Sequence, residues 1–141
     1  MRNRFPILAA LMASALSLQA AEALVMVVHP SNPVKATNKA EAASLLRGDT
    51  LFLGGKKVTL ILGKPSTKSL PAVTYGLLST NPSGLLEKIK QAKMRGVAYD
   101  PVFADSSDEV ESKVAANPSA VGILLQSEAS GKGVRVVPIA D

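Results

Sequence analysis

Two short polar segments carry the residue types best suited to binding a ligand. They read "SNP" at 31–33 and "GKPSTKS" at 63–69, and each lies between an apolar run and a segment with helical character. A helix start offers free N–H groups and the positive end of the helix dipole, so hydroxyls and a lysine there suit phosphate or sulfate. Ordinary capping and turn formation is the alternative explanation. The candidate ligand-binding residues are Ser31, Asn32, Ser66, Thr67, Lys68 and Ser69.

Other site chemistries find little support. His29 is the single histidine and there is no cysteine, whereas a metal site needs three or four ligands. No nucleophile–base pair or catalytic triad has a recognisable spacing, and the phosphate-binding P-loop pattern is absent. We therefore predict a non-enzymatic protein without a metal or cofactor.

The basic character of the chain narrows the class of partner. The formal net charge is +5, but the basic residues are spread along the chain and aromatic residues make up only 4%. Nucleic-acid binding usually needs a basic patch together with aromatic side chains for base stacking, so we do not expect it. The basic segment at 87–95 is typical of a solvated helix face. A mildly basic domain suits an anionic small ligand or an acidic partner surface.

The first 23 residues are predicted to form a secretory signal peptide. Arg2 and Arg4 precede an apolar stretch at 5–18, and small residues in an Ala-x-Ala arrangement follow. The apolar stretch is shorter than the ~20 residues that cross a bilayer. Cleavage two or three residues earlier is the alternative. We expect an exported single domain over 24–141, about 118 residues long, with no membrane span after cleavage.

Apolar runs alternate with segments that have helix-start signals. The runs read as strands buried on both faces, and the caps predict helices between them. The predicted strands are 24–28, 58–62, 120–125 and 134–139, and the predicted helices are 38–46, 70–78, 81–93 and 106–117. This order predicts an α/β fold with a mixed, mainly parallel sheet and helices on both faces. With no disulfide available, the aliphatic core must stabilise it.

One junction resembles a known family. "VESKVAANPSAVGIL" at 110–124 resembles the signature of periplasmic phosphate-type substrate-binding proteins of ABC transporters, in which a helix ends at Asn-Pro and turns at once into a buried strand. The segments at 24–34, 40–61, 77–89 and 94–101 are similar to other parts of these proteins. The closest likeness is to their short, single-domain members.

The resemblance implies one lobe of a periplasmic-binding-protein-like (type 2) fold. It also implies a periplasmic location, binding of phosphate or a similar inorganic anion, and a membrane permease or other periplasmic protein as partner. Many members have an arginine where this chain has Leu70, which leaves Lys68 as the candidate cation. The alternative is an accessory or interaction module that kept the fold and lost the ligand.

The two polar segments are expected to meet in space. Ligands of parallel sheets collect at the carboxyl ends of the strands. If Ser66 to Ser69 hold an anion, Lys68 should lie within reach of the same point as Ser31 or Asn32.

Overall fold

The computed structural model describes residues 22–141, so nearly all of the predicted signal peptide lies outside the described residues. The helices are α2 (Lys39–Arg47), α3 (Ser69–Leu78), α4 (Pro82–Met94), α5 (Ser107–Ala116) and the short 3-10 helix η1 (Gln126–Glu128). The strands are β1 (Leu24–Val28), β2 (Thr37–Asn38), β3 (Phe52–Leu53), β4 (Lys56–Lys57), β5 (Thr59–Gly63), β6 (Val102–Ala104), β7 (Ala120–Leu125) and β8 (Arg135–Ala140).

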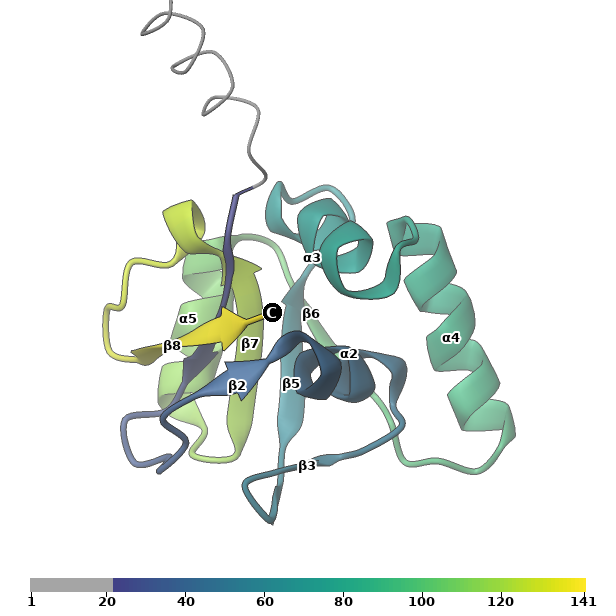
Figure 1. Cartoon of the computed structure of the whole chain (residues 1–141), viewed down its shortest axis with the longest axis horizontal. Coiled ribbons are helices and arrows are strands. Elements are labelled where there is room, and N and C mark those ends of the chain that lie inside the picture. The colour runs from purple at the N-terminus through teal and green to yellow at the C-terminus, as the bar shows by residue number, and fades with distance from the viewer. Residues whose placement is uncertain (1–21) are drawn as a thin grey trace, which may run out of the picture.

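Six of the strands form one mixed sheet in the order β2-β8-β1-β7-β5-β6 (Figure 1). β5 pairs in parallel with β6 and β7, and β2 pairs in parallel with β8. β1 lies antiparallel to both of its neighbours, β7 and β8. The prediction of a mixed, mainly parallel sheet is confirmed. β3 and β4 form a separate hairpin through Gly54 and Gly55, which both have a positive φ.

Helices cover both faces of the sheet, as predicted. Along β1, Met26 and Val28 contribute to the core on the side of α2, α3 and α4, whereas Val27 contributes to the core beneath α5. The period of two in a strand sends successive side chains to opposite faces. Because β1 is central, both sets are buried, which explains its uninterrupted apolar run.

The predicted helix caps are present. Asn38 Oδ1 accepts the Glu41 N–H at 2.8 Å, and Asn81 Oδ1 accepts the Gly84 N–H at 2.9 Å. Ser106 Oγ accepts the Glu109 N–H at 3.1 Å. Each cap satisfies a donor that the first helical turn would leave unpaired, so these helices begin where the sequence indicates.

The Asn-Pro junction joins α5 directly to β7. Asn117 ends α5, and its Oδ1 accepts the Ser119 N–H at 3.0 Å, while Pro118 cannot continue the helix. A Cβ at Gly122 would lie 2.8 Å from Val110 Cγ1 and 2.9 Å from a methyl group of β1. The glycine therefore allows α5 and β1 to approach β7 closely.

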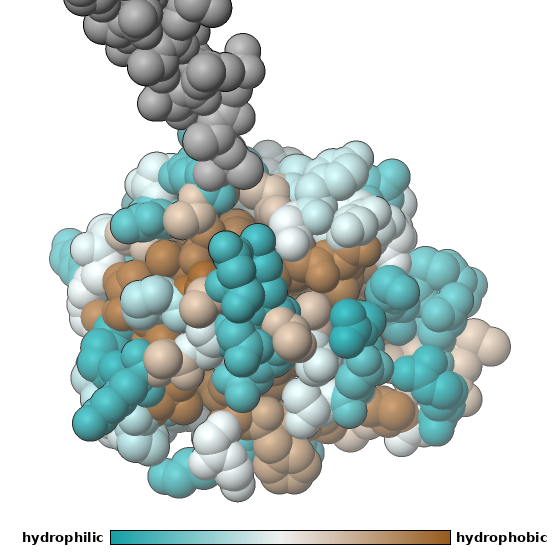
Figure 2. All heavy atoms as spheres, viewed as in Figure 1, coloured by the Kyte–Doolittle hydropathy of each residue, from teal (hydrophilic) through white to brown (hydrophobic). Residues whose placement is uncertain are grey.

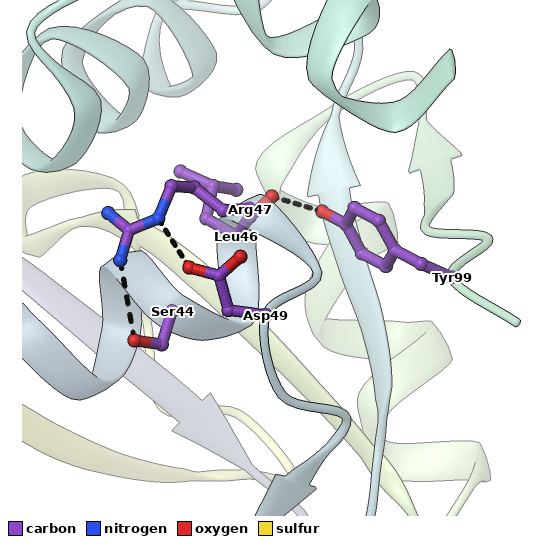
Figure 3. Close-up of polar contacts among 5 residues, drawn as sticks. All are labelled: Ser44, Leu46, Arg47, Asp49 and Tyr99. Carbon is purple, nitrogen blue, oxygen red and sulfur yellow. Dashed lines mark hydrogen bonds and ion pairs between the residues drawn. The ribbon is translucent and has the colours of Figure 1, made fainter. Parts of the chain in front are cut away.

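A buried tyrosine ties the end of α2 to the segment before β6. The Tyr99 hydroxyl donates a hydrogen bond to the Leu46 carbonyl, close to the exposed Arg47–Asp49 ion pair (Figure 3). The ring is 3% exposed, and this burial raises the pKa of Tyr99 because the phenolate would lose its hydration.

Replacing Tyr99 with phenylalanine is expected to lower the free energy of unfolding by about 1–2 kcal/mol, because the Leu46 carbonyl loses its donor while the ring is kept. The difference should shrink at high pH. A raised folded-state pKa means that wild-type stability is complete below the ordinary tyrosine pKa of about 10 and falls above it. Phenylalanine cannot ionise and lacks this loss. Urea unfolding of both proteins at pH 8 and pH 11 tests the prediction, and a constant difference would contradict it.

Candidate functional site

The 64–69 loop follows β5 and leads into α3, as predicted, but two of its hydroxyls already bond to protein groups. Thr67 Oγ1 donates to the Lys64 carbonyl at 2.6 Å and accepts the Leu70 N–H at 3.4 Å. Ser69 is 1% exposed, and its Oγ accepts the Leu125 N–H of β7 at 3.3 Å. Both hydroxyls therefore stabilise the start of α3, which leaves Ser66 and Lys68 exposed at the surface of the loop.

Lys68 is the available cation of this loop. Among the described residues, no carboxylate lies within 4.0 Å of its ammonium group. The Glu22 carboxylate is near enough to feel the charge, but it accepts the Ser127 N–H at 2.8 Å. Hydrogen bonding with the Ser127 side chain and then with its backbone N–H lowers the pKa of Glu22, and the charge of Lys68 lowers it slightly further.

The second lysine of the loop is engaged. Lys64 forms an ion pair with Asp105, which follows β6, so the carboxyl ends of two neighbouring strands are joined. Hydrogen bonding in this pair raises the pKa of Lys64 and lowers the pKa of Asp105. An anion arriving at this edge would meet a neutralised pair at Lys64 and a free charge at Lys68.

The expectation that Lys68 lies close to Ser31 and Asn32 is wrong. Because β1 is antiparallel to β7, its last residue, Val28, pairs with Val121 near the start of β7, and Val121 pairs with Leu60 near the start of β5. The segment after β1 therefore lies at the opposite edge of the sheet from the loop after β5, as Figure 1 shows. The six predicted residues form two separate groups.

The group at the opposite edge forms a turn. Ser31 Oγ lies 2.7 Å from His29 Nδ1, and Asn32 Oδ1 accepts the Val34 N–H at 3.0 Å. The guanidinium of Arg135 donates to the Asn32 and Val34 carbonyls. Ser31 and Asn32 also line a small cavity of about 130 Å³, but their polar atoms serve the turn, in agreement with the capping and turn interpretation.

A larger apolar groove lies beside Lys68 and was not predicted. Its volume is about 920 Å³, and it lies between α3, the start of β1 and the end of β8. Figure 2 shows apolar surface in this part of the molecule, next to a column of hydrophilic side chains. The charged lining residues are Glu22, Lys39, Lys68 and Asp141, and the rest of the lining includes Leu24, Ala72, Tyr75, Gly76 and Ile139.

The sequence of α3 contained a pattern that could have indicated one wall of this groove. Lys68, Ala72, Tyr75 and Gly76 have the spacing of one helix face. Tyr75 is 59% exposed, so its ring projects from the fold instead of filling the core. The tertiary partners across the groove come from both ends of the chain, and spacing within α3 could not identify them.

Within residues 22–141, no helix is long and apolar enough to cross a membrane. The same residues contain no cluster of three or more histidine, aspartate or glutamate side chains placed to hold a metal ion.

No protein-family model and no curated protein matches the chain. Solved structures do match. An ABC-type phosphate transport receptor from Vibrio cholerae superposes with a TM-score of 0.55 at 18% identity, covering 85% of this chain and 48% of that one. PstS from Borrelia burgdorferi gives a TM-score of 0.59 at 18% identity, covering 84% and 47%.

A third match carries its ligand. It is a phosphate ABC-transporter substrate-binding protein from Clostridium perfringens with bound phosphate, at a TM-score of 0.56 and 19% identity, covering 84% of this chain and 45% of that one. The chain thus spans about half the length of these proteins. It has a periplasmic-binding-protein-like fold, and the predicted resemblance to PstS-like phosphate receptors is confirmed for the fold.

Proposed function

We propose that this chain is an exported, periplasmic solute-binding domain that binds phosphate or a similar inorganic anion without catalysing a reaction. The observation that carries the proposal is the free ammonium of Lys68, exposed where β5 leads into α3 in a fold shared with phosphate receptors. The positive net charge favours the approach of anions. An ABC permease is the partner that such a domain would serve.

The ligand is expected to contact Lys68 and the exposed hydroxyl of Ser66. Thr67 and Ser69 hold the loop in shape through their bonds to Lys64 and Leu125, so their role is to position the other two. Ser31 and Asn32 lie at the other edge of the sheet and are left out of the proposed site.

Replacing Lys68 with alanine is expected to weaken phosphate binding about three- to fivefold, because an exposed ion contact contributes at most about 1 kcal/mol. Isothermal titration of the exported protein with phosphate and with sulfate measures the change. Lys90→Ala, on the exposed face of α4, removes the same charge away from the loop and is the matched control. Equal affinities for the two variants would contradict the assignment of Lys68.

An interaction module that lost its ligand is the second candidate. The internal bonds of Thr67 and Ser69 favour it, since these hydroxyls are not free to bind an anion. Under this hypothesis, millimolar phosphate and sulfate produce no heat. A periplasmic protein is then retained on the immobilised domain in buffer without either anion.

A further inference from the structure

The groove beside Lys68 is amphipathic, because charged and apolar residues both line it. One face of α3 forms a wall from Lys68 through Ala72 and Tyr75 to Gly76, a length of about 12 Å at 1.5 Å per residue. Leu24 and Ile139 contribute apolar surface from the sheet. The volume of about 920 Å³ falls within the range of small-molecule sites.

The charged residues of the groove differ in how far they are neutralised. The Lys39 ammonium lies 2.9 Å from the Asp141 carboxylate, so this pair is neutral overall. Lys68 has no carboxylate within 4.0 Å among residues 22–141. The nearby Glu22 also lines the groove, but it belongs to the predicted signal peptide, so the exported domain would lack it. Charge complementarity therefore favours an occupant with one anionic end, placed at Lys68, and an apolar body that follows α3.

We infer that the groove binds an organic phosphate monoester, with its phosphate at Lys68 and its apolar group against Ala72, Tyr75 and Gly76. The inference rests on the proposed anion binding and gives the ligand a second, apolar part. It explains why apolar surface is exposed immediately beside the loop that carries the free cation. An inorganic anion would leave this surface uncovered, whereas an alkyl or aryl ester would bury it.

The test is a chain-length series measured by isothermal titration on the exported protein. The ligands are inorganic phosphate and methyl, butyl and hexyl phosphate. A fully buried methylene strengthens binding about fourfold, and an open groove buries about half of it, so each methylene should add about a factor of two. Hexyl phosphate is then expected to bind about 30-fold more tightly than methyl phosphate.

Two variants and one control test the contacts of the apolar group and of the phosphate separately. Tyr75→Ala removes an exposed wall residue and should reduce the gain from methyl to hexyl phosphate to less than tenfold. Phe52→Ala, which removes another exposed aromatic ring outside the groove, should leave the gain unchanged. Lys68→Ala should weaken every phosphate in the series by a similar factor, because it acts only on the anionic end.

The outcomes distinguish this inference from the proposed function. Equal affinity for inorganic, methyl and hexyl phosphate would overturn the inference and keep the proposed function. Absence of binding by every phosphate would overturn both. Hexanol binding as tightly as hexyl phosphate would overturn the role of Lys68. A dimeric mass by light scattering, with no binding of hexyl phosphate, would assign the groove to a second copy of the chain and overturn the inference.

Discussion

Replacing Glu111 with alanine is expected to lower the free energy of unfolding by about 2–4 kcal/mol, among the largest losses for a single polar side chain in this fold. The Glu111 side chain lies on α5 and is 3% exposed. One carboxylate oxygen accepts the Ser130 N–H at 3.1 Å and the Ser130 hydroxyl at 2.9 Å. The other accepts the Gly131 N–H at 2.9 Å. Alanine would leave these donors without their acceptor and release the loop between η1 and β8.

The control is Glu109→Ala on the same helix. Glu109 Oε1 lies 4.0 Å from Lys113 Nζ in an exposed pair, so its loss should cost less than about 1 kcal/mol. Urea unfolding at pH 7 measures both variants. Hydrogen exchange at Ser130 and Gly131 provides a local readout and should accelerate in Glu111→Ala alone. Similar losses for the two variants, with unchanged exchange at the loop, would refute the role of Glu111.

Local chemistry made much of the fold predictable. The caps at Asn38, Asn81 and Ser106 each depend on a side chain and an N–H three residues later, so their geometry is contained in a short stretch of sequence. The break at Asn117–Pro118 is local in the same sense. Strand identity followed from apolar runs, because strands buried on both faces need no polar side chains.

Strand direction was not predictable in this way. An apolar run such as Leu24–Val28 looks the same whether the strand runs parallel or antiparallel to its neighbours. β1 is antiparallel to both β7 and β8. Ser31 and Asn32, which follow β1, therefore lie at the edge of the sheet opposite the loop after β5. A common site for the two segments depended on pairing between distant parts of the chain, which neither segment specifies.

Burial of Glu111 was partly visible in the sequence. Acidic residues near the start of a helix, such as Asp108 and Glu109 of α5, are typical favourable partners of the helix dipole. However, Glu111 is four residues after Ser107 and three before Val114, which are both buried, so it belongs to the inward face. Its partners at 130–131 could be found only from the tertiary structure, because nothing in the loop sequence specifies a carboxylate neighbour.

The second large effect is expected at Gly48, the residue that ends α2. Gly48→Ala should lower the free energy of unfolding by about 2–5 kcal/mol for two reasons. The φ of +75° is a left-handed conformation that costs an alanine about 1–2 kcal/mol. A Cβ would also lie 2.5 Å from Tyr99 Cδ2 and 2.9 Å from Cγ, and relieving such a buried clash costs about 1–3 kcal/mol more.

Gly96 separates these two contributions. Its φ is +80°, and a Cβ there would have no atom within 4 Å, so Gly96→Ala should show the backbone cost alone. The clash can also be tested in a double-mutant cycle with Tyr99→Ala, which removes the ring. In that background, adding Gly48→Ala should cost no more than Gly96→Ala does in the wild type, as measured by urea unfolding. If Gly48→Ala costs the same with and without the Tyr99 ring, then close packing against Tyr99 is not the reason for glycine at this position.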